Sequence, residues 1–379
     1  MGFGSFHMHA RSGMATEYLG KDYASLIRMC TDEAKKRGLY SGLYDEDRFP
    51  SGYAGGLLTK DIRYRERRLV FTKEFTESVD FEEANTTGKP YLLACYDVTL
   101  DSDGYLSEYR TVSASEEAKG EKWYAYVKTA QNNPIYNNQA YADTLSREAM
   151  DGFIHLTYDF FKENIGDEFG DTVKLIFSDE PSIRYRTLFN FSKGKDDAVV
   201  ACTMHFPELF TDYCGLDIVK ALPEVFWELP NGRTSKIRYR YYDFLAELFA
   251  SSCYDNLGNW CEKNGVMLTA HTMAEKSLDY QCEWNSEVMR LYRRLQLPGM
   301  DLLCNRLELN TAKQCQSVVH QYGREGMMSE LYGVTDWDFD FRGHKFQGDW
   351  QGLSALPTEC LILRGYIWAE RQKETTPPL

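Results

Sequence analysis

Several features that would mark other classes of protein are missing from this sequence. Its 379 residues contain no apolar run that approaches the roughly 18 residues of a membrane-spanning helix. Residues 1–13 have neither the charged start nor the apolar stretch of a secretory signal. We therefore expect no membrane association and, for the chain as written, a cytoplasmic location; the location of any longer precursor stays open.

Motifs for several kinds of chemistry are also absent. The ten cysteines form no Cys-x-x-Cys pair, so they predict free thiols rather than a metal cage or a disulfide framework. No Gly-x-Ser-x-Gly elbow, P-loop or helix-opening Gly-x-Gly-x-x-Gly turn occurs. The net charge is -14 and no stripe rich in Lys or Arg offsets it, so a nucleic acid would be repelled. Acyl transfer, nucleotide chemistry and nucleic-acid binding lose support accordingly.

The residues that are present predict one α/β domain. Apolar residues make up 43% of the chain, which is enough to fill a sizeable core. Short apolar runs alternate with longer amphipathic ones, as in βα units around a parallel sheet. This pattern predicts a (β/α)8 TIM barrel over residues 1–363. Its eight predicted strands cover residues 4–9, 39–44, 123–127, 173–177, 266–270, 300–303, 326–329 and 359–363.

Three segments depart from the barrel pattern. Residues 67–122 predict a strand-rich insertion, because apolar runs of β type are joined there by an Asp-Ser-Asp-Gly turn. Residues 183–233 are punctuated by Pro and Gly and predict an insertion that covers the site like a lid. Residues 364–379 form an atypical tail without an eighth helix. A barrel that lacks its last helix would stay open on one side and expose apolar surface.

Polar residues stand at the carboxyl ends of the predicted strands. In a TIM barrel these ends converge on one face, where the active site lies. Glu180 and Glu330 each end an apolar run and precede a turn, on the fourth and seventh predicted strands. Trp337 is a candidate for stacking on a sugar ring. The predicted substrate-binding residues are His9, Arg11, Asp45, Glu46, Asp47, Asp179, His271, Glu275, Tyr332 and Trp337.

Two facing carboxyl groups are what the cleavage of a glycosidic bond requires. One protonates the leaving oxygen, while the other acts as nucleophile or as base toward water. Glu180 and Glu330 are therefore predicted as the catalytic pair of a glycosidase, with a carbohydrate as substrate. The alternative for each is an exposed strand-end carboxylate or a partner of a helix start.

The other candidates admit more than one interpretation. Asp45, Glu46 and Asp47 form an acidic cluster that suits sugar hydroxyls, a calcium ion or plain solvation. The cluster has no ligand-spacing motif, so no cofactor is predicted and calcium is kept as an alternative. His271 and Glu275 would share one face of a helix and suit sugar binding or a metal. A metal-dependent hydrolase is therefore a further alternative.

Several segments resemble those of large bacterial TIM-barrel glycosidases. They are GFGSFHMH (2–9), LYDEDRFPSG (43–52), SDEP (178–181) and MSELYG (328–333). The group they resemble is the α-L-rhamnosidase-like proteins around glycoside hydrolase family 106. The resemblance covers most of residues 2–352, including PGMD (298–301) and DFRGHK (340–345). It implies a barrel and a sugar substrate, with Glu180 as the general acid and Glu330 as nucleophile or base.

Two departures from that group are visible. Many retaining barrel glycosidases have Asn before the acid/base Glu, whereas Asp179 stands there in this chain, which leaves retention or inversion open. Members of the group are also much longer and carry β-sandwich domains around the barrel. The chain is therefore interpreted either as an active glycosidase or as a truncated, non-catalytic barrel fragment that binds sugar. The sugar, the linkage and the oligomeric state are not determined by these patterns.

Overall fold

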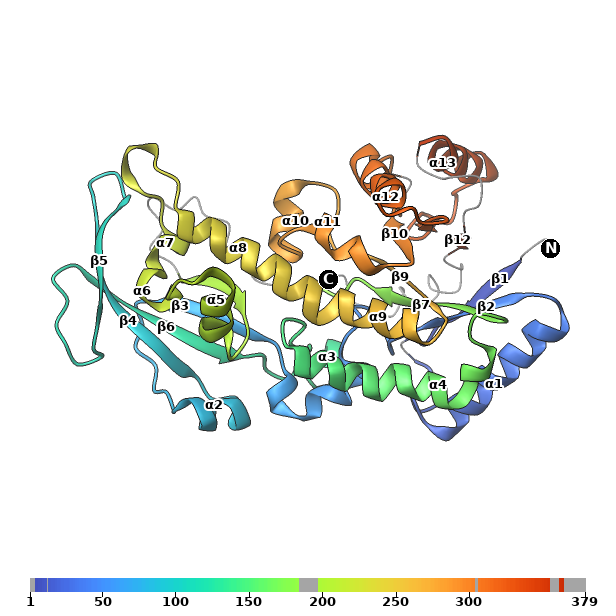
Figure 1. Cartoon of the computed structure of the whole chain (residues 1–379), viewed down its shortest axis with the longest axis horizontal. Helices are drawn as coiled ribbons and strands as arrows, with labels where there is room; N and C mark the ends of the chain where they lie inside the picture. The colour runs from blue at the N-terminus through green and yellow to red at the C-terminus, as the bar shows by residue number, and fades with distance from the viewer. Residues whose placement is uncertain (1–3, 12, 184–196, 304–305, 355–360, 365–379) are drawn as a thin grey trace.

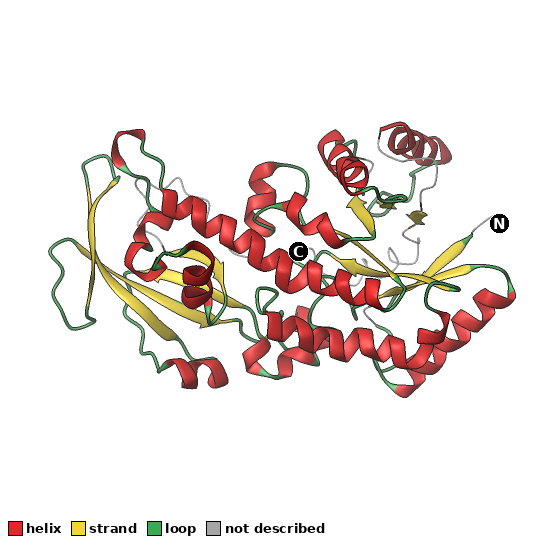
Figure 2. Ribbon diagram, viewed as in Figure 1, coloured by secondary structure: helices red, strands yellow, loops and turns green. Residues whose placement is uncertain are grey.

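The structure is a computed structural model, and it describes residues 4–11, 13–183, 197–303, 306–354 and 361–364. Within these ranges the chain forms two sheets, one seven-stranded and one five-stranded. The two sheets lie toward opposite ends of the long axis of the molecule (Figure 1). Helices flank both of them (Figure 2).

The seven-stranded sheet is parallel throughout, with the strand order β1-β2-β7-β9-β10-β11-β12. Because all the strands run the same way, their carboxyl ends meet along one edge of the sheet. This edge carries Asp179, His271, Asp301 and Glu330. The strands are β1 (Ser5–Met8), β2 (Tyr40–Tyr44), β7 (Val173–Asp179), β9 (Met267–His271), β10 (Leu297–Asp301), β11 (Met328–Leu331) and β12 (Leu361–Arg364).

Helices connect these strands and bury one face of each against the sheet. In α1, for example, Tyr23, Ile27, Thr31 and Ala34 recur at helical spacing and are all buried. The connecting helices are α1 (Lys21–Lys36), α3 (Arg147–Phe153), α4 (Asp159–Ile165), α8 (Lys236–Phe249), α9 (Asp255–Lys263), α10 (Leu278–Trp284), α11 (Val288–Leu291), α12 (Leu309–Tyr322) and α13 (Phe341–Ser354).

The prediction of a closed (β/α)8 TIM barrel is wrong. β1 and β12 occupy the two outer positions of the parallel sheet, and across the described ranges they do not pair with each other. A barrel closes only when its first and last strands complete the ring of hydrogen bonds. The sheet is therefore an open half-barrel. Seven of the eight predicted strands correspond to its members, and the predicted tail beyond Arg364 lies outside the described residues.

The predicted third barrel strand, residues 123–127, belongs to the other sheet. It forms the middle of β6 (Glu121–Thr129), which pairs antiparallel with β3 (Arg67–Thr72) and β4 (Tyr91–Leu100). Its run is apolar throughout because both faces of β6 are covered: Trp123 is 2% exposed and Tyr126 0%. A short apolar run has the same pattern in a buried parallel strand and in a buried antiparallel one.

The five-stranded sheet is antiparallel and has the order β5-β4-β6-β3-β8. Its core includes Phe71, which stacks on Phe226 at 4.7 Å between ring centroids. Most of its strands come from residues 67–122. One of its two edge strands, β8, comes from the range 183–233 that was predicted as a lid, and residues 184–196 of that range lie outside the described part. Its remaining elements are β5 (Leu106–Val112), β8 (Ala198–Cys202), α2 (Phe81–Thr87), α5 (Phe206–Cys214), α6 (Ile218–Ala221) and α7 (Pro223–Phe226).

Two long helical stretches contain a π turn each. α3 continues through the π turn Ile154–Tyr158 into α4, and α8 continues through Ala250–Tyr254 into α9. Such turns are frequent at functional sites. Both end on a fully buried tyrosine, Tyr158 or Tyr254, whose hydroxyl bonds to a loop beside the edge described above.

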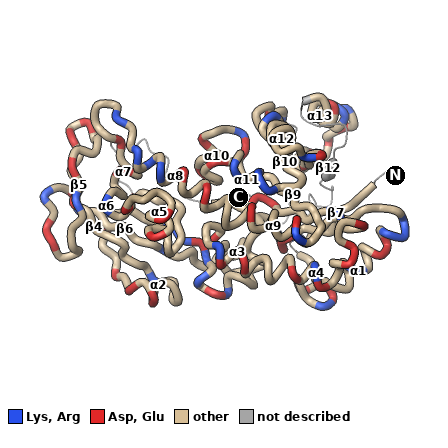
Figure 3. The backbone as a smooth tube through the Cα atoms, in the orientation of Figure 1, with Lys and Arg blue, Asp and Glu red and all other residues tan. Residues whose placement is uncertain are grey.

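Charged residues are spread over the whole molecule. Basic and acidic positions are interspersed along the described chain, without a continuous basic stripe (Figure 3). None of the helices in the described ranges is long and apolar enough to cross a bilayer. A polyanion such as a nucleic acid thus meets an acidic molecule with a net charge of -14.

Candidate active site

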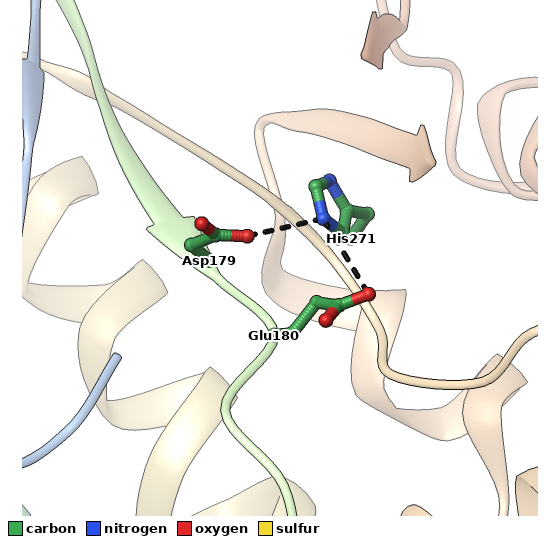
Figure 4. Close-up of side chains that lie close together, drawn as sticks. All are labelled: Asp179, Glu180 and His271. Atoms are coloured by element: carbon green, nitrogen blue, oxygen red, sulfur yellow. Dashed lines mark ion pairs between the residues drawn. The ribbon is translucent and has the colours of Figure 1, made fainter. Parts of the chain in front are cut away.

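A fully buried histidine stands at the centre of the carboxyl edge of the parallel sheet. The Nε2 atom of His271 lies 3.2 Å from Oδ1 of Asp179, 3.8 Å from Oε1 of Glu180 and 3.8 Å from Oε2 of Glu330. Figure 4 shows the first two of these contacts. The ends of β7, β9 and β11 thus bring together four of the residues that the sequence singled out.

The two predicted catalytic carboxylates are therefore neighbours of one nitrogen atom. Because Oε1 of Glu180 and Oε2 of Glu330 each lie 3.8 Å from Nε2 of His271, these oxygens are no further apart than twice that distance. Catalytic carboxyl groups are separated by about 5–5.5 Å in retaining glycosidases and about 6.5–9.5 Å in inverting ones. Glu180 and Glu330 are close enough to act on one glycosidic bond.

Burial raises the pKa of both carboxyl groups. The pKa of Glu330 rises to about 8, because burial and the charges of Asp179 and Asp301 outweigh the opposing effect of His271. The pKa of Glu180 is raised well above its ordinary value, again chiefly by burial. A carboxyl group that keeps its proton near neutral pH is what a general acid requires.

Asp179 and His271 form an ion pair beside these two groups. Burial opposes ionisation of Asp179, but the contact with His271 and a hydrogen bond from Tyr44 lower its pKa. The Tyr44 hydroxyl donates to Oδ2 of Asp179 at 2.7 Å. Burial alone would lower the pKa of His271, yet the surrounding carboxylates raise it well above its ordinary value. The histidine is therefore held in its charged form.

Asp301 is a member of this cluster that sequence reasoning missed. It is the last residue of β10, and its Oδ1 atom is buried without a hydrogen-bond partner. The apolar run predicted a strand over residues 300–303, which placed Asp301 inside the strand rather than at its end. A register three residues earlier would have marked it by the same strand-end rule.

Glu46 and Asp47 lie in the loop after β2, but their carboxylates are occupied by this part of the molecule. Glu46 is fully buried and accepts hydrogen bonds from the backbone amides of residue 47 and residues 52–55. Oδ2 of Asp47 accepts from Nε of Arg48 at 3.1 Å and from Nδ2 of Asn137 at 2.9 Å. Glu46 therefore organises its own loop.

Asp45 connects that loop to the end of β7, the strand that precedes Glu180. It is fully buried and accepts hydrogen bonds from the hydroxyls of Ser51 at 2.5 Å and Tyr158 at 2.7 Å. Burial raises its pKa to about 7. The Ser51 hydroxyl in turn accepts from the backbone amide of Asp179 at 2.8 Å. Asp45 thus lies behind the cluster around His271 rather than within it.

Glu275 holds two neighbouring strand ends together by hydrogen bonds. The segment between β9 and α10 is not helical, so His271 and Glu275 do not share a helical face. Oε1 of Glu275 accepts from the Tyr292 hydroxyl at 2.8 Å and from the amide of Thr272 at 3.1 Å, and Oε2 accepts from the amide of Asp301 at 3.2 Å. These bonds tie the end of β9 to the end of β10.

The remaining predicted residues lie at the rim of the same edge. His9 follows β1 and its ring packs at a tilt against Tyr44, with 3.5 Å between ring centroids; burial lowers the pKa of His9 to about 3. Arg11 is exposed and lowers the pKa of Glu330 by its charge. Trp337 is 66% exposed in the loop between β11 and α13. Tyr332, in the same loop, has a left-handed backbone with φ 67°.

The cluster also has the donor set of a cation site. Asp179, Glu180 and His271 form one group, and His271, Asp301 and Glu330 form another; within each, one ligand atom per residue lies within 4.8 Å of the others. Imidazole nitrogen together with carboxylate oxygen suits a first-row divalent metal.

Comparisons with known proteins point to one fold. No protein-family model and no curated protein matches the chain. Among solved structures, the fold is similar to that of a rhamnosidase from Novosphingobium sp. PP1Y, with a TM-score of 0.63 at 11% sequence identity. The match covers 93% of this chain and 50% of that chain, so this chain spans about half the length of that protein. The fold is thus rhamnosidase-like, and membership of family 106 stays a prediction.

Proposed function

We propose that the chain is a glycoside hydrolase that cleaves O-glycosidic bonds with Glu180 and Glu330. The observation that carries the proposal is the approach of both carboxylates, from different strands, to Nε2 of His271 at 3.8 Å. Two carboxyl groups at this spacing, both with raised pKa values, suit acid catalysis at a glycosidic oxygen. The rhamnosidase-like fold supports a deoxysugar such as L-rhamnose as the first substrate to test.

The surroundings of the two groups suggest which one acts as the acid. Glu180 is 8% exposed, and its pKa is raised well above its ordinary value, so it keeps the proton that a leaving oxygen needs. The side chain of Glu330 is 24% exposed, against 11% for that of Glu180. Burial raises the pKa of Glu330 to about 8, and Arg11 as well as His271 opposes this rise, so Glu330 ionises the more readily of the two. Glu330 is therefore assigned as nucleophile or as base toward water. The charged His271 stabilises the carboxylate that ionises.

Turnover of a panel of nitrophenyl glycosides, including the α-L-rhamnoside, tests this function. Glu180→Gln and Glu330→Gln should each lower kcat by about 10²–10⁴-fold without loss of fold, because general acid and base groups contribute on that order. Glu325→Gln is a matched control, since this exposed residue precedes β11 at the opposite edge of the sheet. Full activity in both site variants would refute the assignment of Glu180 and Glu330 as the catalytic pair. Sugar binding without turnover by the parent chain would identify a sugar-binding protein instead.

A metal-dependent hydrolase is the second candidate, favoured by two residues of the cluster. Both ring nitrogens of His271 and Oδ1 of Asp301 are buried without a hydrogen-bond partner, and both residues belong to the candidate cation groups. A cation would bind His271 in its neutral form. A cation held there would polarise the bond to be hydrolysed or activate a water. Turnover that stops in EDTA and returns with Mn²⁺, Zn²⁺ or Ca²⁺ would support this candidate, whereas turnover that persists in EDTA would support the carboxylate pair alone.

A further inference from the structure

The turn that carries Glu180 is hydrogen-bonded on both sides of that residue. We propose that Ser51 and Tyr254 are positioning residues, which hold this turn so that the Glu180 carboxylate is aimed for the reaction. The inference rests on the proposed function of Glu180. It concerns two residues that lie outside the cluster around His271.

The backbone of Glu180 needs such support. Its φ is 48°, in the left-handed region that residues with a side chain rarely occupy. This conformation costs about 1–2 kcal/mol relative to the right-handed one. A strained residue persists only where its surroundings over-determine it, and such residues gather at active sites. The groups that bond to residues 179 and 181 are therefore the ones that keep Glu180 in place.

Ser51 holds the residue before Glu180 through both of its polar groups. Its amide donates to the carbonyl of Asp179 at 2.8 Å, and its hydroxyl accepts from the amide of Asp179 at 2.8 Å. The same hydroxyl donates to Oδ1 of Asp45 at 2.5 Å, which orients its lone pairs toward Asp179. The loop of Ser51 is itself fixed by the amides that converge on Glu46. The support before Glu180 is thus rigid.

Tyr254 holds the residue after Glu180. Its hydroxyl donates to the carbonyl of Pro181 at 3.1 Å. The tyrosine ends the π turn between α8 and α9, which directs it toward this loop. The next residue, Ser182, is also bonded on both backbone groups: its amide donates to the Tyr141 hydroxyl at 3.3 Å, and its carbonyl accepts from the Thr144 hydroxyl at 3.0 Å. Glu180 is therefore the strained position between two bonded neighbours.

Neither positioning residue can touch a substrate. Ser51 and Tyr254 are both 0% exposed. Their effect on the reaction must act through the placement of Glu180, and a displacement of about 1 Å in a catalytic group lowers turnover by about 100-fold. We therefore expect loss of either hydroxyl to lower kcat and to leave KM nearly unchanged.

The test compares two variants with two matched controls, all in the full chain. Ser51→Ala and Tyr254→Phe each remove one of the two hydroxyls that hold the turn around Glu180, which we call the clamp. Ser286→Ala and Tyr241→Phe remove a buried hydroxyl of the same kind elsewhere: Ser286 donates to a backbone carbonyl at 2.7 Å and Tyr241 at 2.6 Å. For each variant, kcat and KM are measured on a glycoside that the parent cleaves, together with the midpoint of thermal unfolding.

The expected result is a fall in kcat of about 10- to 100-fold in Ser51→Ala and Tyr254→Phe, with KM within about twofold of the parent value. The two controls should keep the parent kcat even if their unfolding midpoints fall as much as those of Ser51→Ala and Tyr254→Phe. Unchanged kcat in both clamp variants, or equal losses in clamp variants and controls, would overturn the inference. Because Glu180→Gln is assayed in parallel, an inactive parent or an active Glu180→Gln would instead refute the proposed function itself.

Discussion

Glu46 and Glu330 stand at the same edge of the parallel sheet but differ in what their carboxyl groups contact. Glu46 follows β2, is 0% exposed and accepts hydrogen bonds from five backbone amides of its own loop. At the end of β11, the Glu330 side chain is 24% exposed and lies 3.8 Å from Nε2 of His271. Both were predicted at the carboxyl ends of strands as site residues. Only Glu330 directs its carboxylate toward the cluster.

The difference lies in how the loop after β2 satisfies its backbone hydrogen bonds. Gly52 and Gly55 in the first loop have φ values of 131° and 61°, which let consecutive amides turn toward one carboxylate. Glu46 thereby replaces the hydrogen bonds that a buried loop would otherwise lack. A strand-end carboxylate is available for chemistry only where the following loop does not use it in this way.

The largest effect that would test this contrast is on stability. Glu46→Gln should lower the free energy of unfolding by about 3 kcal/mol, because the new amide group faces backbone donors and leaves them unpaired in the interior. Glu330→Gln should change it by less than about 1 kcal/mol, because glutamine has the same size and Glu330 accepts no comparable set of backbone hydrogen bonds. Unfolding in guanidinium chloride measures both.

Equal losses of stability in the two variants would refute the distinction between a loop-forming and a site-forming carboxylate. The Glu325→Gln variant, at an exposed position before β11, gives the baseline for a glutamate without either role.

The same contrast explains how far the sequence could predict this molecule. Strand positions and the residues that follow them are local patterns, so the placement of Glu180, His271 and Glu330 at the carboxyl edge could be predicted. Closure of the sheet depends on pairing between strands far apart in the chain, which no local run encodes. Asp301 was missed because the predicted register of β10 ran past its end. The role of Glu46 depends on where five amides point, and residue types alone do not give that.

A smaller effect is the dependence of stability on pH that Asp45 contributes. Burial raises the pKa of Asp45 from its ordinary value of 3.8 to about 7. Between these values the unfolded chain has lost this proton while the folded chain keeps it. The free energy of unfolding should therefore fall as pH rises through this window, by at most about 1.4 kcal/mol per pH unit from this group. Asp45→Asn should flatten that slope in urea unfolding between pH 4 and 7. Identical slopes in parent and variant would show that Asp45 is ionised in the folded chain.

The smallest expected effect concerns Trp337, in the open loop after β11. Its ring is 66% exposed, so Trp337→Ala should leave the free energy of unfolding within about 0.5 kcal/mol of the parent value. A ring that stacks on the sugar contributes roughly 0.5–1.5 kcal/mol, as in other aromatic contacts, so KM should rise about two- to tenfold with kcat unchanged. Phe341→Ala is the matched control, since Phe341 is 92% exposed on α13. The same KM in both variants would remove Trp337 from the substrate-binding surface.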